Sequence, residues 1–353
     1  MSSKVRIGLI GAGFIGKAHA SRYVEERDVE VRTVGASHDD RARGLAETVG
    51  AHNWTTSWQE VVADPELDAV DVCVPNDLHY PVVMGAIEHS KPFLVEKPLA
   101  RSLEEGRKVV EAQEQGGVLG VYGENLRFAP AYLKAKEIID EGGIGTVIML
   151  RINEIHNGPF HSEWFWDARR TGGGALIDMG VHGLFAAEWL ASDRIEHVSA
   201  ELGTLKWHEH CRHGAEDTAF AILRFGRGAL AELVNSWAAP HFDVRVEVHG
   251  TEGSIFLGSR EAAGLKVYSE SGYGRRSPDV EARERPHVAP TVGWSAPTPD
   301  EWHVHGLANE ISHFLACIRG EAKPACTPRD GMRALELVDG IYRAAKSRQR
   351  TQI

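Results

Sequence analysis

The sequence has few cysteines, and they show no pairing pattern. Its 353 residues include only Cys73, Cys211, Cys317 and Cys326, which lie far apart without a CxxC pair. Neither a disulfide framework nor a zinc ribbon is therefore expected. After Met1 the chain leads directly into a strand instead of a secretory signal, so we predict a cytoplasmic protein.

Positive charge and long apolar runs are also scarce. There are 39 Lys+Arg against 50 Asp+Glu, a formal net charge of −11. This acidic balance repels nucleic-acid backbones and anionic lipid surfaces. No apolar run approaches the ~20 residues that a membrane helix needs. We expect no nucleic-acid partner, no membrane partner and, because no GxSxG motif is present, no acyl-transfer nucleophile of that kind.

Residues 1–125 alternate apolar runs with amphipathic stretches, a pattern typical of parallel strands joined by helical crossovers. The predicted strands cover residues 5–10, 29–36, 69–74, 92–95 and 118–122, and the predicted helices cover 13–25, 81–89 and 102–115. This first domain is expected to be a doubly wound parallel α/β sheet.

From residue 126 to residue 353 the pattern changes to that of an α+β domain. The predicted helices cover residues 130–140, 174–191, 306–319 and 328–346, and the predicted strands cover 145–155, 219–225, 229–237, 244–249 and 254–257. Glycine-containing turns at 226–228 and 250–253 indicate two successive hairpins. We expect an open, mainly antiparallel sheet, a surface loop over 270–300 and a closing helix that packs back on the first domain.

A glycine-rich turn follows the first predicted strand and opens the first helix. Its residues are Gly11-Ala-Gly13-Phe14-Ile15-Gly16. Gly11 allows a tight turn, Gly13 lets the backbone approach a pyrophosphate, and Gly16 permits close packing of helix on strand. Alone, the pattern also fits an ordinary turn, but its strand-turn-helix context predicts a Rossmann dinucleotide-binding site.

The end of the second strand bears on which dinucleotide binds. Where a carboxylate would bind the ribose 2′-hydroxyl of NAD, the chain has Ser37, with His38 and Arg41 nearby. This arrangement slightly favours the 2′-phosphate of NADP. Asp39 and Asp40 keep NAD open, so the predicted cofactor is NAD(H) or NADP(H), with a lean toward NADP(H).

The third and fourth strands end in polar residues at the edge where open α/β sheets bind ligands. The candidate cofactor contacts there are Pro75, Asn76, His79, Glu96 and Lys97. The Lys97 ammonium could also stabilise an alkoxide as a hydride leaves the substrate. Taken alone, however, a lysine is more often a solvated surface residue.

In the second domain, Asp178 lies four residues before His182 on the predicted helix. That spacing places both on one face. The carboxylate could orient the imidazole and favour its protonated form, which suits a base for an alcohol proton. A buried pair that satisfies itself is the alternative.

Four segments, in this order, resemble the glucose-fructose oxidoreductase / inositol dehydrogenase (Gfo/Idh/MocA) family over nearly the whole chain. They are GAGFIG (11–16), VPNDLH (74–79), EKPLA (96–100) and GGGALIDMGVH (172–182). The resemblance implies a catalytic set of Lys97, Asp178 and His182. It also implies a cofactor pocket lined by Asn76 and Glu96, and a cis Lys97–Pro98 bond.

The residues and the resemblance together predict the NAD(P)-dependent, reversible oxidation of a ring secondary alcohol of a sugar, glycoside or cyclitol to a ketone. His182 would take the hydroxyl proton, Lys97 would polarise the oxygen, and Asp178 would orient His182 or bind a neighbouring hydroxyl. Two alternatives stay open: a redox-neutral enzyme that oxidises a sugar transiently for glycoside cleavage or epimerisation, and a non-catalytic cofactor-sensing regulator. A homo-oligomer, dimer or tetramer, is expected through the second sheet.

Flat aromatic faces suited to a sugar ring precede the triple glycine, at Trp164 and Trp166, although tryptophan also fills cores. Besides the catalytic set, the candidate substrate contacts are Asn125, Arg127, His156, Trp164, Trp166 and Arg170. The cluster of His208, His210 and His213 lacks the spacing of a tetrahedral zinc site, so we interpret it as a loop and expect no metal.

Overall fold

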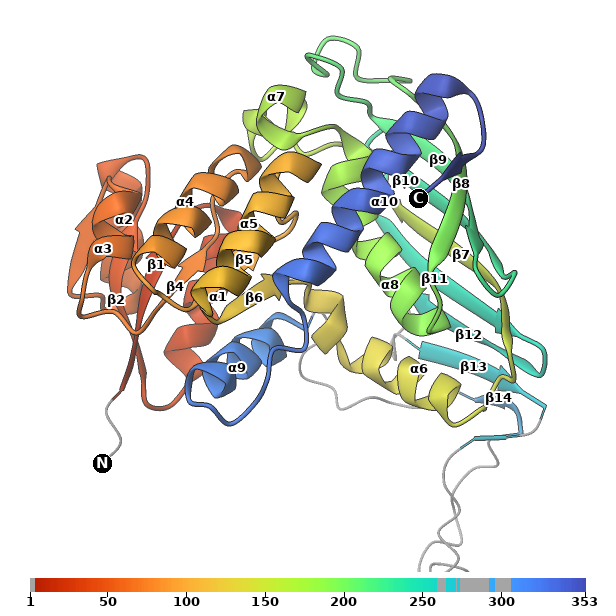
Figure 1. Cartoon of the computed structure of the whole chain (residues 1–353), viewed down its shortest axis with the longest axis horizontal. Coiled ribbons are helices and arrows are strands. Elements are labelled where there is room, and N and C mark those ends of the chain that lie inside the picture. The colour runs from red at the N-terminus through yellow and green to blue at the C-terminus, as the bar shows by residue number, and fades with distance from the viewer. Residues whose placement is uncertain (1–3, 259–264, 271, 274–291, 296–305) are drawn as a thin grey trace, which may run out of the picture.

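The computed structural model describes residues 4–258, 265–270, 272–273, 292–295 and 306–353, which form two sheets flanked by helices (Figure 1). Sheet A has the strand order β3-β2-β1-β4-β5-β6, and every pair in it is parallel. Its strands are β1 (Val5–Ile10), β2 (Val29–Gly35), β3 (Asn53–Thr55), β4 (Ala69–Val72), β5 (Phe93–Glu96) and β6 (Gly120–Gly123). The strand order reverses direction between β1 and β4, and ligands of such sheets bind at this switch point.

The helices of this part are α1 (Phe14–Glu25), α2 (Asp39–Val49), α3 (Trp58–Ala63), α4 (Asn76–Glu88) and α5 (Leu103–Gly116). The predicted doubly wound sheet is confirmed. The sequence did not reveal α2, β3 or α3, because α2 is mostly polar and β3 is three largely exposed residues. Helix α4 begins at Asn76, five residues before the predicted start, and contains Pro81.

Sheet B has the order β14-β13-β12-β11-β7-β10-β9-β8-β15. Its strands are β7 (Val147–Ile155), β8 (Ile195–Gly203), β9 (Thr218–Phe225), β10 (Leu230–Ser236), β11 (Asp243–Gly250), β12 (Gly253–Gly258), β13 (Leu265–Ser269), β14 (Gly293–Ser295) and β15 (Thr351–Gln352). The hairpins β9–β10 and β11–β12 are antiparallel as predicted, whereas β7 and β10 run parallel. Strands β8, β13, β14 and β15 were not predicted. Part of the predicted loop, 293–295, forms β14, while 271, 274–291 and 296–300 lie outside the described residues.

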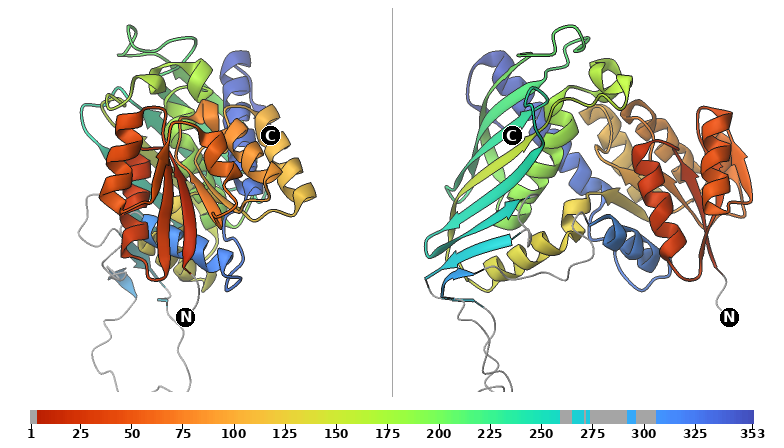
Figure 2. Two further views of the ribbon diagram at one scale, coloured as in Figure 1. Left: turned by 90° about the vertical axis from the view of Figure 1, so that its left-hand side faces the viewer. Right: turned by 180° about the vertical axis from the view of Figure 1, so that it is seen from behind.

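The remaining helical segments are η1 (Asn125–Phe128), α6 (Pro130–Asp140), η2 (Glu163–Trp166), α7 (Ala168–Thr171), η3 (Leu176–Gly180), α8 (Val181–Ala191), α9 (Leu307–Ile318) and α10 (Pro328–Ser347). Helices α6, α8 and α10 lie on the face of sheet B that is turned toward sheet A, and the opposite face carries no described helix (Figure 2). Alternating burial along β9 shows the same two-sided character, with one face buried and the other open. No described helix is both long and apolar enough to cross a membrane.

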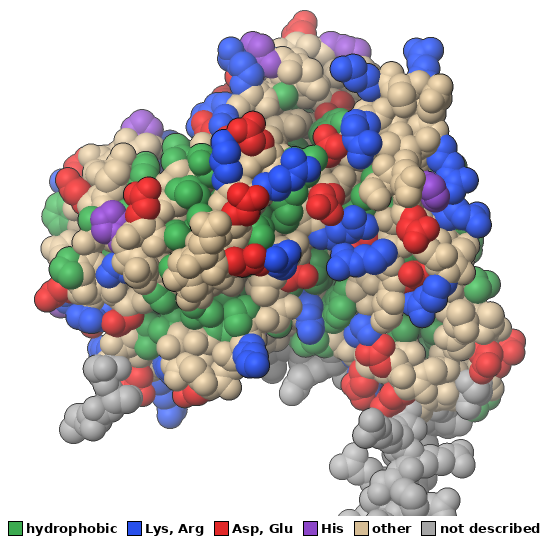
Figure 3. All heavy atoms as spheres, viewed as in Figure 1, with side chains coloured by type: hydrophobic (Ala, Val, Ile, Leu, Met, Phe, Trp, Pro, Cys, Tyr) green, Lys and Arg blue, Asp and Glu red, His purple; other side chains and the backbone are tan. Residues whose placement is uncertain are grey.

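Helices α9 and α10 both pack on the first part of the chain. In α9, Ile311 and Phe314 are fully buried in one cluster with residues of β1 and β2. Helix α10 packs on α5, where Gly106 leaves space for Leu335 and Met332. On the face of the molecule that Figure 1 shows, acidic and basic side chains are interspersed over the surface (Figure 3).

Candidate active site

A cavity of about 780 Å³ lies along the carboxyl edge of sheet A and is bounded on its other side by residues of the second part. It brings together many of the predicted cofactor residues: Gly11, Gly13, Phe14, Ile15, Ser37, His38, Arg41, Pro75, Asn76, Glu96 and Lys97. From the second part come the predicted His156, Trp164, Arg170 and Asp178. Residues from far-apart segments thus share one cavity.

The glycine turn fits a pyrophosphate. Gly11 has a φ of 122°, and a Cβ there would collide with the Cys73 carbonyl oxygen. A Cβ at Gly16 would collide with the Gly11 carbonyl oxygen, because helix and turn pack closely. A Cβ at Gly13 would meet nothing within 4 Å among the described atoms, so the turn leaves space there for a ligand.

The ribose end of the cavity is lined by Ser37, His38 and Arg41. The nearby Asp39 does not line it, and its Oδ1 accepts a hydrogen bond from Trp54 Nε1 at 3.1 Å. Among the described residues lining this end, none carries a carboxylate. Electrostatically, this end can accept either a ribose hydroxyl or a phosphate.

Lys97 and Asp178 form an ion pair at the wall of the cavity. Lys97 follows β5, and its Nζ donates to the Asp178 backbone oxygen at 2.8 Å and to Oδ1 at 3.2 Å. Burial lowers the pKa of Lys97, but Asp178 and Glu96 outweigh it and raise the pKa above its usual value. The lysine is therefore charged at neutral pH. The peptide bond between Lys97 and Pro98 is cis, as the resemblance implied.

His182 is paired with Glu124, not with Asp178. Its Nδ1 lies 2.8 Å from Glu124 Oε1, and the Glu124 carboxylate is completely buried. Since a carboxylate only accepts, Nδ1 carries the hydrogen and Nε2 of the neutral imidazole is free to accept a proton. Burial lowers the pKa of His182, but Glu124 raises it above the usual value.

The expectation that Asp178 orients His182 is wrong, and the local helix geometry explains why. Asp178 lies in η3, a single π-helical turn, whose wider spacing no longer aligns residues four apart. Its carboxylate instead meets Lys97 and, through Oδ2, the Nε1 of Trp237 at 3.2 Å.

A buried glutamate fixes the start of this helical segment. Glu216 accepts hydrogen bonds from the backbone N–H of Gly174 at 3.0 Å and of Leu176 at 2.9 Å. The Tyr342 hydroxyl of α10 donates to the same carboxylate at 3.1 Å. A Cβ at Gly174 would collide with the Glu216 backbone, which explains a glycine at this position.

Two predicted cofactor residues lie outside the cavity lining: Gly16, which packs against the turn as described above, and His79. His79 is 1% exposed, and its two ring nitrogens lie 2.6 Å from the Pro98 carbonyl oxygen and 2.9 Å from that of Val74. Burial lowers its pKa. The prediction is corrected: His79 ties together the two strand ends that carry Asn76 and Lys97.

Three predicted substrate contacts also lie elsewhere. Asn125 and Arg127 belong to η1 outside the cavity lining, and the Arg127 guanidinium lies 4.6 Å from the centre of the Trp189 ring. Trp166 is fully buried and packs against Trp237 with ring centroids 5.1 Å apart. The core reading of Trp166 is therefore the correct one.

Of the other predicted substrate contacts, His156, Trp164 and Arg170 line the cavity with Lys97 and Asp178, whereas His182 lies outside the lining. Trp164 stacks on Phe165, with ring centroids 3.9 Å apart. Arg170 makes two hydrogen bonds to the Asp77 carboxylate, at 2.9 and 3.2 Å, and so connects the two parts of the chain beside the cavity. His156 accepts from the Gly158 N–H, and burial lowers its pKa.

Two features of the site were not predicted from the sequence: Glu124 and a buried polar group around His19. Glu124 directly follows β6, so the strand-end rule that found Lys97 could have found it too. His19 of α1 lies 2.8 Å from Asp71 and 3.2 Å from Glu96, and these side chains are also close to Cys73 and Glu310. Their atoms are close enough to hold an ion, but the hydrogen bond of His19 to Asp71 favours a structural role.

The histidines of the predicted loop have separate partners. His213 Nδ1 lies 2.9 Å from Asp167 Oδ1, whereas the His210 ring packs edge-on against Phe160. His208 is exposed. This arrangement favours the loop interpretation of the segment.

Family models and individual proteins match this chain. Residues 5–123 match the oxidoreductase family with NAD-binding Rossmann fold, and residues 132–256 match the GFO/IDH/MocA C-terminal domain. Scyllo-inositol 2-dehydrogenase (NAD(+)) of Bacillus subtilis (strain 168) is 30% identical over 96% of this chain and 93% of its own length. Inositol 2-dehydrogenase 2 of Saccharopolyspora erythraea is 33% identical over 72% of this chain and 73% of its own.

The fold also matches solved structures. The crystal structure of GenD2 from gentamicin A biosynthesis in complex with NAD has a TM-score of 0.83 and 26% identity, covering 100% of this chain and 97% of that one. These matches agree with the parallel sheet A and with the dinucleotide-binding character of its glycine turn. The chain therefore belongs to the GFO/IDH/MocA family of oxidoreductases, with an NAD-binding Rossmann fold in its first part.

Proposed function

We propose that this protein oxidises a secondary alcohol on a polyhydroxylated ring, a cyclitol or a sugar, to the ketone and also catalyses the reverse reaction. The observation that carries the proposal is the Lys97–Asp178 ion pair in the lining of a cavity that begins at a dinucleotide-binding turn. A second pair, His182–Glu124, lies near enough for the Lys97 charge to act on the pKa of His182. Relatives named inositol and levoglucosan dehydrogenases support the substrate class.

Bound NAD supplies the hydride acceptor, and the turn of Gly11 and Gly13 with the N-terminus of α1 would hold its pyrophosphate. His182 Nε2 accepts the hydroxyl proton, while Glu124 stabilises the imidazolium that forms. Lys97 donates a hydrogen bond to the same substrate oxygen and stabilises its developing negative charge. Asp178 keeps Lys97 charged and aimed at that oxygen.

The reaction class is tested by following NADH absorbance with purified protein and a panel of myo-inositol, scyllo-inositol, D-glucose and levoglucosan. Net NADH formation with at least one polyol is expected. Product formation without net NADH would favour the redox-neutral alternative. Tight dinucleotide binding without turnover on any ring alcohol would favour the regulator.

The cofactor is expected to be NAD(H), as in the NAD complex of the structural relative. The lean toward NADP(H) finds no support in these relatives, although Ser37 and Arg41 leave room for a phosphate. The variant Ser37→Asp places a carboxylate at the ribose end, where it repels the 2′-phosphate. We expect kcat/KM with NADP to fall by about tenfold or more, equal to ~1.4 kcal/mol, while NAD is used as before. Equal use of both dinucleotides by the variant would contradict this assignment.

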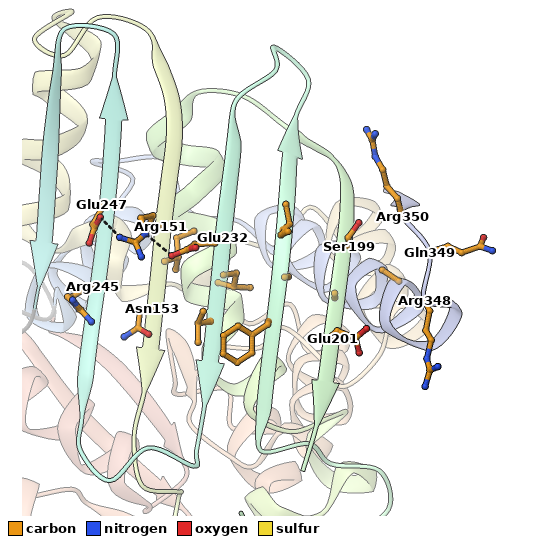
Figure 4. A pocket seen from close by; sticks show the side chains of 18 residues that line it. Arg151, Asn153, Ser199, Glu201, Glu232, Arg245, Glu247, Arg348, Gln349 and Arg350 are labelled. Atoms are coloured by element: carbon orange, nitrogen blue, oxygen red, sulfur yellow. Dashed lines mark hydrogen bonds and ion pairs between the residues drawn. The ribbon is translucent and has the colours of Figure 1, made fainter. Parts of the chain in front are cut away.

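We further propose that two copies associate through the open face of sheet B (Figure 4). Phe220 and Ile222 of β9 are 53% and 61% exposed there. Beside them Arg151 Nε lies 2.7 Å from Glu232, so apolar and charged groups both meet the solvent. Exposed apolar patches with polar rims mark protein interfaces.

The variant Ile222→Asp tests this interface, because a second copy would have to bury the new carboxylate. We expect the wild type to sediment as a dimer or tetramer, and the variant to shift toward monomer at the same concentration. Helical content by circular dichroism should stay unchanged. A wild-type protein that sediments as a monomer at micromolar concentration would contradict the proposal.

A further inference from the structure

Glu154 is a partly buried carboxylate near the candidate site that the mechanism above does not use, and it lies outside the cavity lining. It lies on β7, two residues after the buried Ile152 and two before His156, which lines the cavity. Because side chains alternate along a strand, these three share the inner face of sheet B, which η3 and α8 cover. Glu154 therefore faces the helical segment that carries Asp178 and His182.

The Glu154 carboxylate has no hydrogen-bond or ion-pair partner among the described residues, although it is only partly exposed. On the adjacent strand, its neighbour in register is Asn235, whose amide atoms are both buried and also unpartnered. A partly buried carboxylate without a partner is costly unless a ligand or water satisfies it.

The charges around Glu154 are those of the proposed catalytic groups. Burial raises its pKa to about 7, His182 and Lys97 lower it, and Asp178 and Glu124 raise it. The geometry agrees, because Asn235, the register neighbour of Glu154, has its Oδ1 2.8 Å from where a Cβ on Gly180 would lie, in the segment between Asp178 and His182. None of the catalytic groups uses Glu154 as a hydrogen-bond partner, so it is available to a molecule bound between them.

A polyhydroxylated ring brings the complementary chemistry. When the oxidised carbon lies between Lys97 and His182, the hydroxyl on the neighbouring ring carbon lies within a few ångströms of that carbon. A carboxylate has two oxygens that accept from hydroxyl donors. A site built to hydrogen-bond a hydroxyl strongly rejects an analogue that lacks it, because its buried polar group is left unpaired.

We propose that Glu154 binds the hydroxyl adjacent to the carbon that is oxidised, and so selects vicinal diols over isolated ring alcohols. This inference rests on the proposed function and names the substrate class within it. It assigns Glu154 a place in direct contact with the substrate, separate from proton transfer by His182.

The test combines protein variants with deoxy substrates. The kcat/KM is measured for the best polyol of the panel and for its analogues lacking one hydroxyl beside the oxidised carbon. For the wild-type protein, kcat/KM should be roughly 10- to 100-fold lower with one of these deoxy analogues than with the full substrate. This is the range expected for the loss of a charge-assisted hydrogen bond. For Glu154→Ala, kcat/KM with the full substrate should fall by a similar factor. The kcat/KM values of this variant for the full substrate and for the deoxy analogue should then differ by less than about threefold.

Two further variants separate contact from structure. Glu154→Gln keeps an accepting oxygen and should recover part of the discrimination. Glu196→Gln, an exposed glutamate of β8 in the same sheet, is the matched control and should behave as wild type. NAD affinity, measured by fluorescence titration, should be the same in all of them, which shows that the fold is intact.

The outcomes separate this inference from the function beneath it. If wild type and Glu154→Ala lose the same factor on every deoxy analogue, the contact is refuted while the dehydrogenase assignment stands. If wild type forms no NADH with any polyol, the proposed function fails, and the contact fails with it.

Discussion

Replacing Lys97 or His182 with alanine is expected to reduce kcat/KM by orders of magnitude while leaving NAD affinity nearly intact. Loss of a preorganised donor to a developing oxyanion typically costs about 10²- to 10³-fold. Loss of a positioned general base costs about 10²- to 10⁴-fold. The kcat/KM is measured from steady-state NADH formation. The affinity for the dinucleotide is measured from the quenching of protein fluorescence by NADH.

Lys108→Ala is the matched control for Lys97→Ala. Lys108 is an exposed lysine of α5 whose Nζ pairs with Glu104 of the same helix at 2.6 Å. Its removal should change turnover by less than about twofold, because exposed ion pairs contribute little. Undiminished turnover in Lys97→Ala or His182→Ala would remove that residue from the mechanism.

The second large effect is expected from Glu124→Gln, which keeps the size of the side chain but removes its charge. Without the carboxylate, the imidazolium formed during the reaction is less stable, and the hydrogen on Nδ1 is no longer enforced. We expect the maximal kcat/KM to fall by about 10²-fold, as for the loss of general-base assistance. The measurement is the pH profile of kcat/KM for the wild type and the variant.

The direction of the pH shift follows from the charges. Burial lowers the pKa of His182, and Glu124 raises it above its usual value. The base acts when neutral, so activity is lost as pH falls through this pKa. Removing the Glu124 charge lowers the pKa, and the acid limb should move to lower pH. An unchanged limb with reduced turnover would mean that Glu124 acts only on structure.

The parts of the site that the sequence predicted are those set by local rules. Lys97 and Asn76 follow parallel strands, and the carboxyl ends of such strands share one edge of the sheet whatever the rest of the chain does. Glu124 obeys the same rule after β6 but escaped notice, because its partner His182 is 58 residues away.

The errors concern burial and helix geometry, which the sequence does not display. Trp164 and Trp166 are two residues apart and alike in chemistry, yet one lines the cavity and the other fills the core. The π turn that directs Asp178 toward Lys97 depends on Glu216, which comes from a distant segment. Glu154 could be found only once its face of β7 was known.

The long closing helix has a mechanical consequence. Helix α10 has 20 residues, which makes it a rod of about 30 Å, and it packs against α5 on one side and β8 on the other. Helix α10 therefore helps to fix the angle between the two sheets. A hinge motion that opened the cavity by separating the sheets would expose buried leucines of α10, such as Leu335, which packs against α5. Ligand entry is thus expected to depend on movement of the cavity-lining segments around Phe165 and Phe242, with the two sheets moving as one body.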